Sequence, residues 1–131
     1  MIDAKAATNQ LVYATLSPAF DQSEAGVYED VPANEPLPVI ILGDIEAQPF
    51  ARSDDPDRRV TLSLITLTEG DERAPCVALQ AKAEGLLVGQ SFEHEGWGLH
   101  ISLGSSDAVL TDDGTGYVGT TILNVLAFRE D

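Results

Sequence analysis

Residues 36–45 read PLPVIILGDI and predict the central strand of the fold. Two prolines are followed by four unbroken aliphatic residues, 39–42. A continuous apolar run rich in β-branched residues is typical of a strand that is buried on both faces. Pro36 and Pro38 fit only at the start of such a strand, where a missing N–H costs no ladder hydrogen bond. We therefore expect a buried central strand over about residues 37–47.

The segments beside this strand predict its neighbours in a sheet. Residues 27–31 alternate as a short strand, and residues 32–35 form a turn. Residues 60–64 alternate cleanly and extend to residue 67, so they are expected to pair antiparallel with the central strand. Residues 49–59 between the two strands predict an exposed hairpin tip or a longer arm.

The C-terminal third predicts two further strands. Residues 99–103 form the first strand, residues 104–107 are expected to break it, and residues 109–110 resume it. Asp-Gly at 113–114 predicts a tight turn before a long strand over residues 117–128. One face of that strand carries Val118, Thr120, Ile122, Asn124, Leu126 and Phe128, and the other carries Tyr117, Thr121, Leu123, Val125 and Ala127.

Two helices are predicted. Asp3 is a plausible N-cap for a helix over residues 4–16, whose inward stripe is Ala4, Ala7, Leu11 and Ala14, widened by Val12 and Leu16. A second helix opens after Gly70 and runs to about residue 87. Its inward stripe is Cys76, Leu79, Ala83 and Leu86.

Together these elements predict a single α+β domain over residues 1–131. It consists of one mostly antiparallel sheet of four to five strands with two helices packed on one face. The other face of the sheet is then uncovered. Since apolar residues such as Ile122 and Leu126 alternate with Leu123 and Val125, we expect another subunit to bury the second face.

The charge of the chain excludes several classes of partner. It has 131 residues with 7 Lys+Arg and 22 Asp+Glu, a net charge of −15. Seven cations cannot supply a basic DNA-binding footprint, and an anionic membrane surface is disfavoured for the same reason. No apolar run approaches the roughly 20 residues that span a bilayer. The N-terminus also lacks a signal-peptide pattern, which predicts a cytoplasmic location in the cell that makes the protein.

The negative charge itself has two interpretations. Excess charge of one sign keeps a protein dispersed and soluble. Alternatively, the charge lines a passage in which a polyanion slides without sticking. Composition does not choose between them.

Residues that could carry catalysis or bind a metal are few. The single cysteine, Cys76, excludes an internal disulfide and a cysteine-based zinc site. His94 and His100 lack a second histidine at helical ligand spacing, and no nucleophile signature is present. Aspartates 54, 55 and 57 lack the glycine and terminal glutamate of a calcium loop. We expect no catalytic, cofactor or metal site, and no enzyme.

Positive charge gathers in the segment 49–59 together with an aromatic residue. This composition is typical of interface hot spots, although a solvated hairpin explains it equally well. Trp97 between two glycines is interpreted as a lid on the core, with a subunit contact as the alternative. The predicted subunit or partner interface comprises Phe50, Arg52, Arg58, Arg59, Trp97 and Phe128.

The order of the segments resembles the tail completion, or tail terminator, proteins of long-tailed phages and phage-like gene transfer agents, which join head to tail. The N-terminal helix contributes residues 11–16 (LVYATL). Residues 27–32 (VYEDVP) resemble the family's variable-Tyr-Asp-x-Val-Pro segment, and residues 37–44 (LPVIILGD) resemble its Pro-Tyr-Val-x-Leu-Gly strand. A strand at 60–64, a helix at 77–87 and a long final strand follow in the same order. The chain departs from the pattern at Val39, where an aromatic residue is common, and lacks a tryptophan near the end of the second strand.

The resemblance implies a structural virion protein without catalysis. Such proteins form a ring, expected to be a hexamer, at the head-proximal end of the tail tube. The ring ends tube growth and joins the tail to the head connector or stopper protein, while DNA passes through its lumen without specific binding. The implied location is the neck of the virion tail, after assembly in the host cytoplasm.

A ring needs heterologous contacts that close, and we expect the hairpin 49–59 and the end of the last strand to provide them. The alternative from another class is an acidic inhibitor that mimics DNA and blocks a nuclease. That function requires carboxylates spaced like phosphates along one face.

Overall fold

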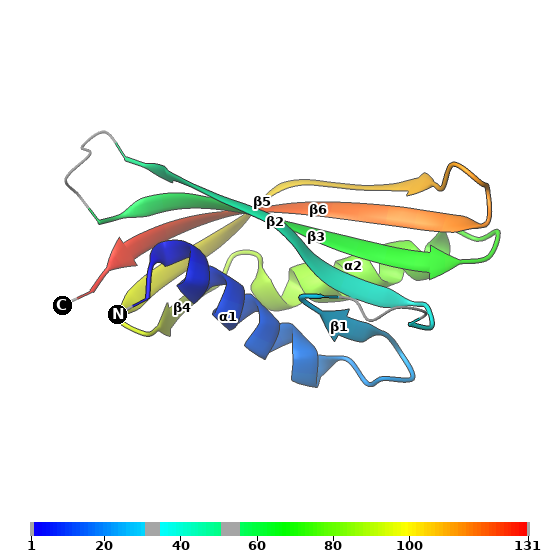
Figure 1. Cartoon of the computed structure of the whole chain (residues 1–131), viewed down its shortest axis with the longest axis horizontal. Coiled ribbons are helices and arrows are strands. Elements are labelled where there is room, and N and C mark those ends of the chain that lie inside the picture. The colour runs from blue at the N-terminus through cyan, green and yellow to red at the C-terminus, as the bar shows by residue number, and fades with distance from the viewer. Residues whose placement is uncertain (1, 31–34, 51–55, 131) are drawn as a thin grey trace.

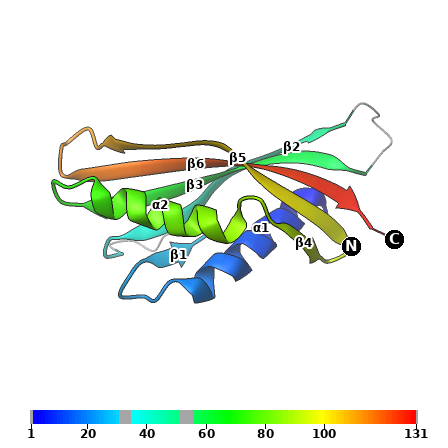
Figure 2. The same cartoon turned by 180° about the vertical axis from the view of Figure 1, so that it is seen from behind.

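The computed structural model describes residues 2–30, 35–50 and 56–130. In these residues the chain forms, in order, α1 (Ala4–Leu16), the short 3₁₀ helix η1 (Ser17–Ala19), β1 (Gly26–Tyr28), β2 (Val39–Pro49), β3 (Arg58–Glu69), α2 (Ala74–Leu87), β4 (Ser91–His94), β5 (Trp97–Leu110) and β6 (Gly116–Arg129). The strands form one sheet in the order β1-β2-β3-β6-β5-β4. Figures 1 and 2 show both helices on the same side of this twisted sheet.

The predicted α+β class is confirmed, but the predicted number of strands is wrong. The described residues form six strands, and β1 pairs with β2 in parallel while the other pairs are antiparallel. The missed strand is β4, which has only four residues and so shows too little alternation to be recognised. A two-residue turn follows it, with positive φ at both Glu95 and Gly96, as expected for a tight hairpin.

The strand predicted to be central lies next to the edge of the sheet. β2 has β1 on one side and β3 on the other, and the middle of the sheet is formed by β3 and β6. Val39, Ile40 and Leu42 are buried as expected, but β2 alternates between half-buried and exposed from Gly43 to Gln48. An unbroken aliphatic run reports burial of side chains on both faces, and here Val39 is buried on one face and Ile40 and Leu42 on the other. The run does not report how many strands lie on either side.

The predicted break at residues 104–107 is also wrong. β5 continues from Trp97 to Leu110 and absorbs Gly104 in a register shift between Leu103 and Ser105. A Cβ atom at Gly104 would lie 2.9 Å from Asn124 Nδ2 and 3.1 Å from the carbonyl oxygen of Ile122. The glycine therefore permits a close approach to β6 within a bulge and does not end the strand.

One face of β3 and β6 builds the core together with the helices. Leu62 and Leu64 of β3, and Leu123 and Val125 of β6, are at most 1% exposed. The inward stripes of the helices are rotated slightly from the prediction. In α1, the predicted inward residue Ala14 is exposed and Thr8 is buried instead. In α2, the predicted inward residue Leu86 is half-buried, and Gln80 and Leu87 are buried. The final strand presents the two faces that its alternation predicts.

A polar network that the sequence did not reveal fixes α2 on the sheet. Gln80 Nε2 donates to the carbonyl oxygen of Asp107 at 2.7 Å. Glu84 Oε2 accepts from Ser106 Oγ at 2.7 Å and from Thr121 Oγ1 at 3.0 Å. Since Gln80 is only 4% exposed, pairing its amide avoids the cost of a buried unsatisfied donor.

The predicted N-cap is confirmed, because Asp3 Oδ1 accepts from the backbone N–H of Ala6 at 2.8 Å. Asp3→Ala is expected to lower the free energy of unfolding by about 1 kcal/mol, measured by urea denaturation. Asp3→Asn keeps an acceptor oxygen and should lose much less. Equal losses in the two variants would show that the carboxylate acts through its charge at the helix terminus and not as a cap.

Candidate interaction surface

The face of the sheet opposite the helices has no second layer among the described residues (Figure 1). We call it the open face; on β3 and β6 it consists of Arg59, Thr61, Ser63, Ile65, Leu67, Val118, Thr120, Ile122, Asn124, Leu126 and Phe128. Leu126 is 41% exposed and Phe128 is 37% exposed, while Ile65 and Ile122 are half-buried. Contiguous exposed apolar area is typical of contact sites.

The two middle strands of this face, β3 and β6, are almost free of carboxylates, while Glu46 of β2 and Asp107 of β5 flank them on the same face. Within β3 and β6 the one acidic residue is Glu69, at the end of β3, although the chain contains 22 Asp+Glu. Covering an uncharged surface costs little desolvation, whereas covering unpaired carboxylates costs much more. The β3–β6 part of the open face could therefore be covered by another protein at little desolvation cost.

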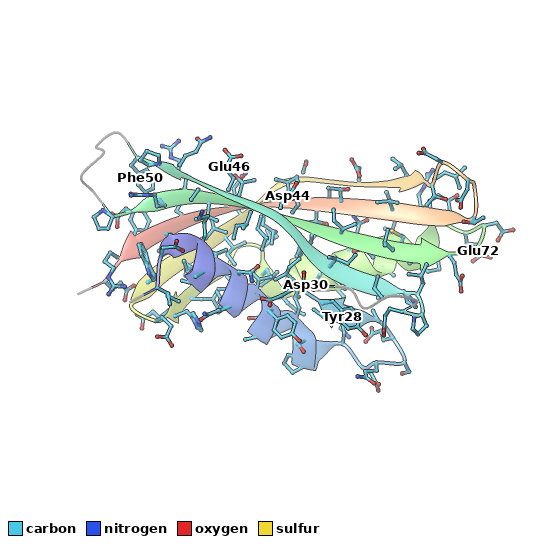
Figure 3. All side chains as sticks on the ribbon, in the orientation of Figure 1. Tyr28, Asp30, Asp44, Glu46, Phe50 and Glu72 are labelled. Carbon is cyan, nitrogen blue, oxygen red and sulfur yellow. The ribbon has the colours of Figure 1, made fainter. Side chains whose placement is uncertain are left out.

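Three aromatic rings and one guanidinium meet at one end of the open face. Phe50 stacks on Phe128 with ring centroids 5.6 Å apart, and His100 meets Phe128 edge-on at 5.7 Å. The Arg59 guanidinium carbon lies 5.1 Å from the centre of the Phe50 ring. We call Phe50, Arg59, His100 and Phe128 the arginine–aromatic cluster. Figure 3 shows Phe50 at one end of the long axis of the molecule.

The structure brings together only part of the predicted interface. Phe50, Arg59 and Phe128 belong to the cluster. Trp97 is 3% exposed, donates from Nε1 to the carbonyl oxygen of Ile2 at 3.0 Å, and lies under the Arg129 guanidinium. This placement is that of a lid on the core.

Arg58 is separated from the cluster although it is adjacent to Arg59 in sequence. Its register partner Ala127 is fully buried, so Arg58 belongs to the helix-covered side, where it lines a groove with Lys5 and Trp97. Some predicted features lie outside the described residues: Arg52, residues 32–34 of the predicted turn, and aspartates 54 and 55. His100 was absent from the predicted interface, although the alternation of its strand placed it on this face.

The titratable groups with shifted pKa values do not converge on one site. Hydrogen bonds from the hydroxyls of Thr111 and Thr115 hold the pKa of Asp113 down to about 2, in the turn between β5 and β6. Burial raises the pKa of the Cys76 thiol on α2. A hydrogen bond with Glu35 raises the pKa of Tyr28 on β1.

The described residues offer neither a metal site nor a membrane-spanning helix. They contain no group of three or more His, Cys, Asp or Glu side chains placed to hold a metal ion. Neither α1 nor α2 has the length and apolarity needed to cross a bilayer.

Comparison with known proteins shows a shared fold. No protein-family model and no curated protein sequence matches this chain. A solved structure described as the virion of a native gene transfer agent (GTA) particle contains a similar chain, with a TM-score of 0.71 and 16% sequence identity. The alignment covers 95% of this chain and 94% of that chain. At this identity the likeness establishes that the two chains have the same fold over nearly their whole length.

Proposed function

We propose that this chain is a structural subunit of a phage-like virion, as the tail terminator resemblance implies. In this proposal, copies form a ring at the head-proximal end of the tail tube. The ring ends tube growth, binds the tube protein on one side and the head connector on the other, and lets DNA pass. The chain is then located in the tail neck and has no catalytic role.

The observation that carries the proposal is the whole-length fold likeness to a chain of a gene transfer agent virion. The open face supports it, because a single-layered sheet with exposed Leu126 and Phe128 gains stability when another molecule covers it. A ring uses two different surfaces on each copy, and such heterologous contacts close when the rotation between copies closes.

The net charge of −15 is compatible with a DNA passage through such a ring. A surface of the same sign as the phosphates does not hold them, so DNA would not be retained. The alternative of a DNA mimic requires rows of carboxylates along one face. The near absence of acidic residues from β3 and β6 weighs against that alternative.

Negative-stain imaging tests the proposal. The purified chain, alone and mixed with a tail tube protein from the same particle, is expected to give rings and tubes capped at one end. Ile122→Glu places a charge in the uncharged middle of the open face and should abolish rings and caps. The control Ala81→Glu adds the same charge at an exposed position of α2, on the other side of the sheet, and should leave them unchanged.

The outcomes test the ring function and the open-face contact separately. If the wild-type chain gives neither rings nor capped tubes, the proposed function is wrong. If Ile122→Glu assembles like the wild type while circular dichroism shows both folded, the function stands and the open face is not the contact.

A further inference from the structure

We propose that the arginine–aromatic cluster of one copy docks against the acidic end of a second copy of this chain, so that copies join head to tail. The inference rests on the proposed function only in requiring that copies meet. It adds which two surfaces meet and the chemistry that joins them.

The acidic end is formed by two neighbouring connections. The end of β3 and the segment after it carry Glu69, Asp71 and Glu72, and the turn between β5 and β6 carries Asp112 and Asp113. All five side chains are exposed. The Gly70 N–H donates to the carbonyl oxygen of Thr115 at 2.8 Å, which holds the two connections together. One cation, Arg73, lies near them and stacks on Tyr117. This end therefore presents a concentrated negative charge.

The cluster and the acidic end cannot meet within one chain. Arg59 and Glu69 lie ten residues apart on the same strand, which corresponds to about 33 Å at roughly 3.3 Å per residue. Figure 3 shows Phe50 and Glu72 at opposite ends of the long axis. Any pairing between these surfaces must therefore join two molecules. Since it joins two different surfaces, it is a heterologous contact of the kind that a ring repeats.

The Arg59 guanidinium is held in place and has no acidic partner among the described residues. Among the described residues its guanidinium has no carboxylate partner, whereas Lys82 pairs with Glu24 at 2.8 Å. Stacking on Phe50 holds the guanidinium plane near the ring at the exposed end of the face. Preorganisation of this kind reduces the entropy lost when a guanidinium binds carboxylates. Arginine and aromatic residues at the centre of a contact are the usual hot spots of protein interfaces.

Arginine beside stacked aromatic rings is also typical of platforms for single-stranded nucleic acid. The chain carries a net charge of −15 and only seven cations, which opposes phosphate binding. The acidic end of another copy offers carboxylates to the same guanidinium. The charge of the chain therefore favours a second copy as the partner.

A charge exchange between the two surfaces tests the inference, with self-association measured by sedimentation equilibrium. Arg59→Glu is expected to weaken association about tenfold or more, because a carboxylate would face the acidic end. The triple variant Glu69→Lys, Asp71→Lys, Glu72→Lys should weaken it to a similar extent. Mixed one to one, the two variants should associate again, because each cluster then faces an end of opposite charge. Lys5→Glu on α1 matches the charge change of Arg59→Glu away from both surfaces and should associate like the wild type.

Failure of the mixture to associate, with both variants folded, would overturn the inference. So would a wild-type chain that stays monomeric at millimolar concentration. Binding of an oligo-dT strand by the wild type, lost in Arg59→Glu, would assign the cluster to nucleic acid instead. Rings and capped tubes that persist in Arg59→Glu would refute this contact and leave the proposed function standing. If the variants show charge-dependent association but the wild type forms neither rings nor capped tubes, the contact stands and the proposed function is wrong.

Discussion

Leu123→Ala is expected to lower the free energy of unfolding by about 2–5 kcal/mol. Leu123 lies in the middle of β6 on the helix-covered side and is 0% exposed. Truncation removes buried methyl groups and leaves a cavity between the sheet and the helices, which the rigid β3–β6 pairing cannot close. Urea denaturation followed by circular dichroism measures the loss as a lower midpoint at an unchanged slope.

Leu126→Ala is the matched control, since it removes the same atoms from the same strand on the open face. With 41% of Leu126 exposed, the unfolding free energy of the isolated chain should fall by less than about 1 kcal/mol. Its main effect is expected on self-association, because the side chain lies between Arg59 and His100 in the register of the sheet. Equal losses of stability in the two variants would contradict a core built on one face only.

Gly116→Ala is expected to destabilise the chain by about 1–3 kcal/mol, toward the upper end of the range for overpacking. A Cβ atom at Gly116 would lie 2.1 Å from the carbonyl oxygen of Thr68 and 3.0 Å from the Cα of Glu69. Both are backbone atoms of the paired strand β3, so no side-chain rotation relieves the clash. The strands must separate where β6 begins.

Gly85→Ala is the control for this substitution. No atom lies within 4 Å of a Cβ at Gly85, which is an exposed position of α2. There the alanine should stabilise the chain by about 0.5–1 kcal/mol, because it reduces the freedom of the unfolded chain and suits the helix. Opposite signs for two glycine-to-alanine changes would confirm that backbone approach governs the first. A loss at Gly116 no larger than about 0.3 kcal/mol would contradict it.

Part of the candidate surface could be predicted because strand side chains alternate. The period of two in β6 places Leu126 and Phe128 on one face and Leu123 on the other without any tertiary information. The same rule separates Arg59 from Arg58, although the predicted interface contained both, and applied to β5 it places His100 beside Leu126. Trp97 was ambiguous, since a tryptophan between glycines suits either a core lid or a contact. Its role as a lid follows from contacts with the carbonyl of Ile2 and the guanidinium of Arg129, which are distant in the sequence.

By itself, the sequence determined both helices, the pairing of β2 with β3, the two faces of β6 and a net charge that opposes nucleic-acid binding. These features follow from local periodicity, capping and composition, which act over a few residues. Only the tertiary structure decided that β3 and β6 occupy the middle of the sheet, that Gly104 sits in a bulge, and that Gln80 and Glu84 fix α2 to β5 and β6. It also decided that Phe50, Arg59, His100 and Phe128 form one cluster. The reason is that strand order and side-chain stacking join residues distant in sequence, and local patterns do not record which distant partners meet.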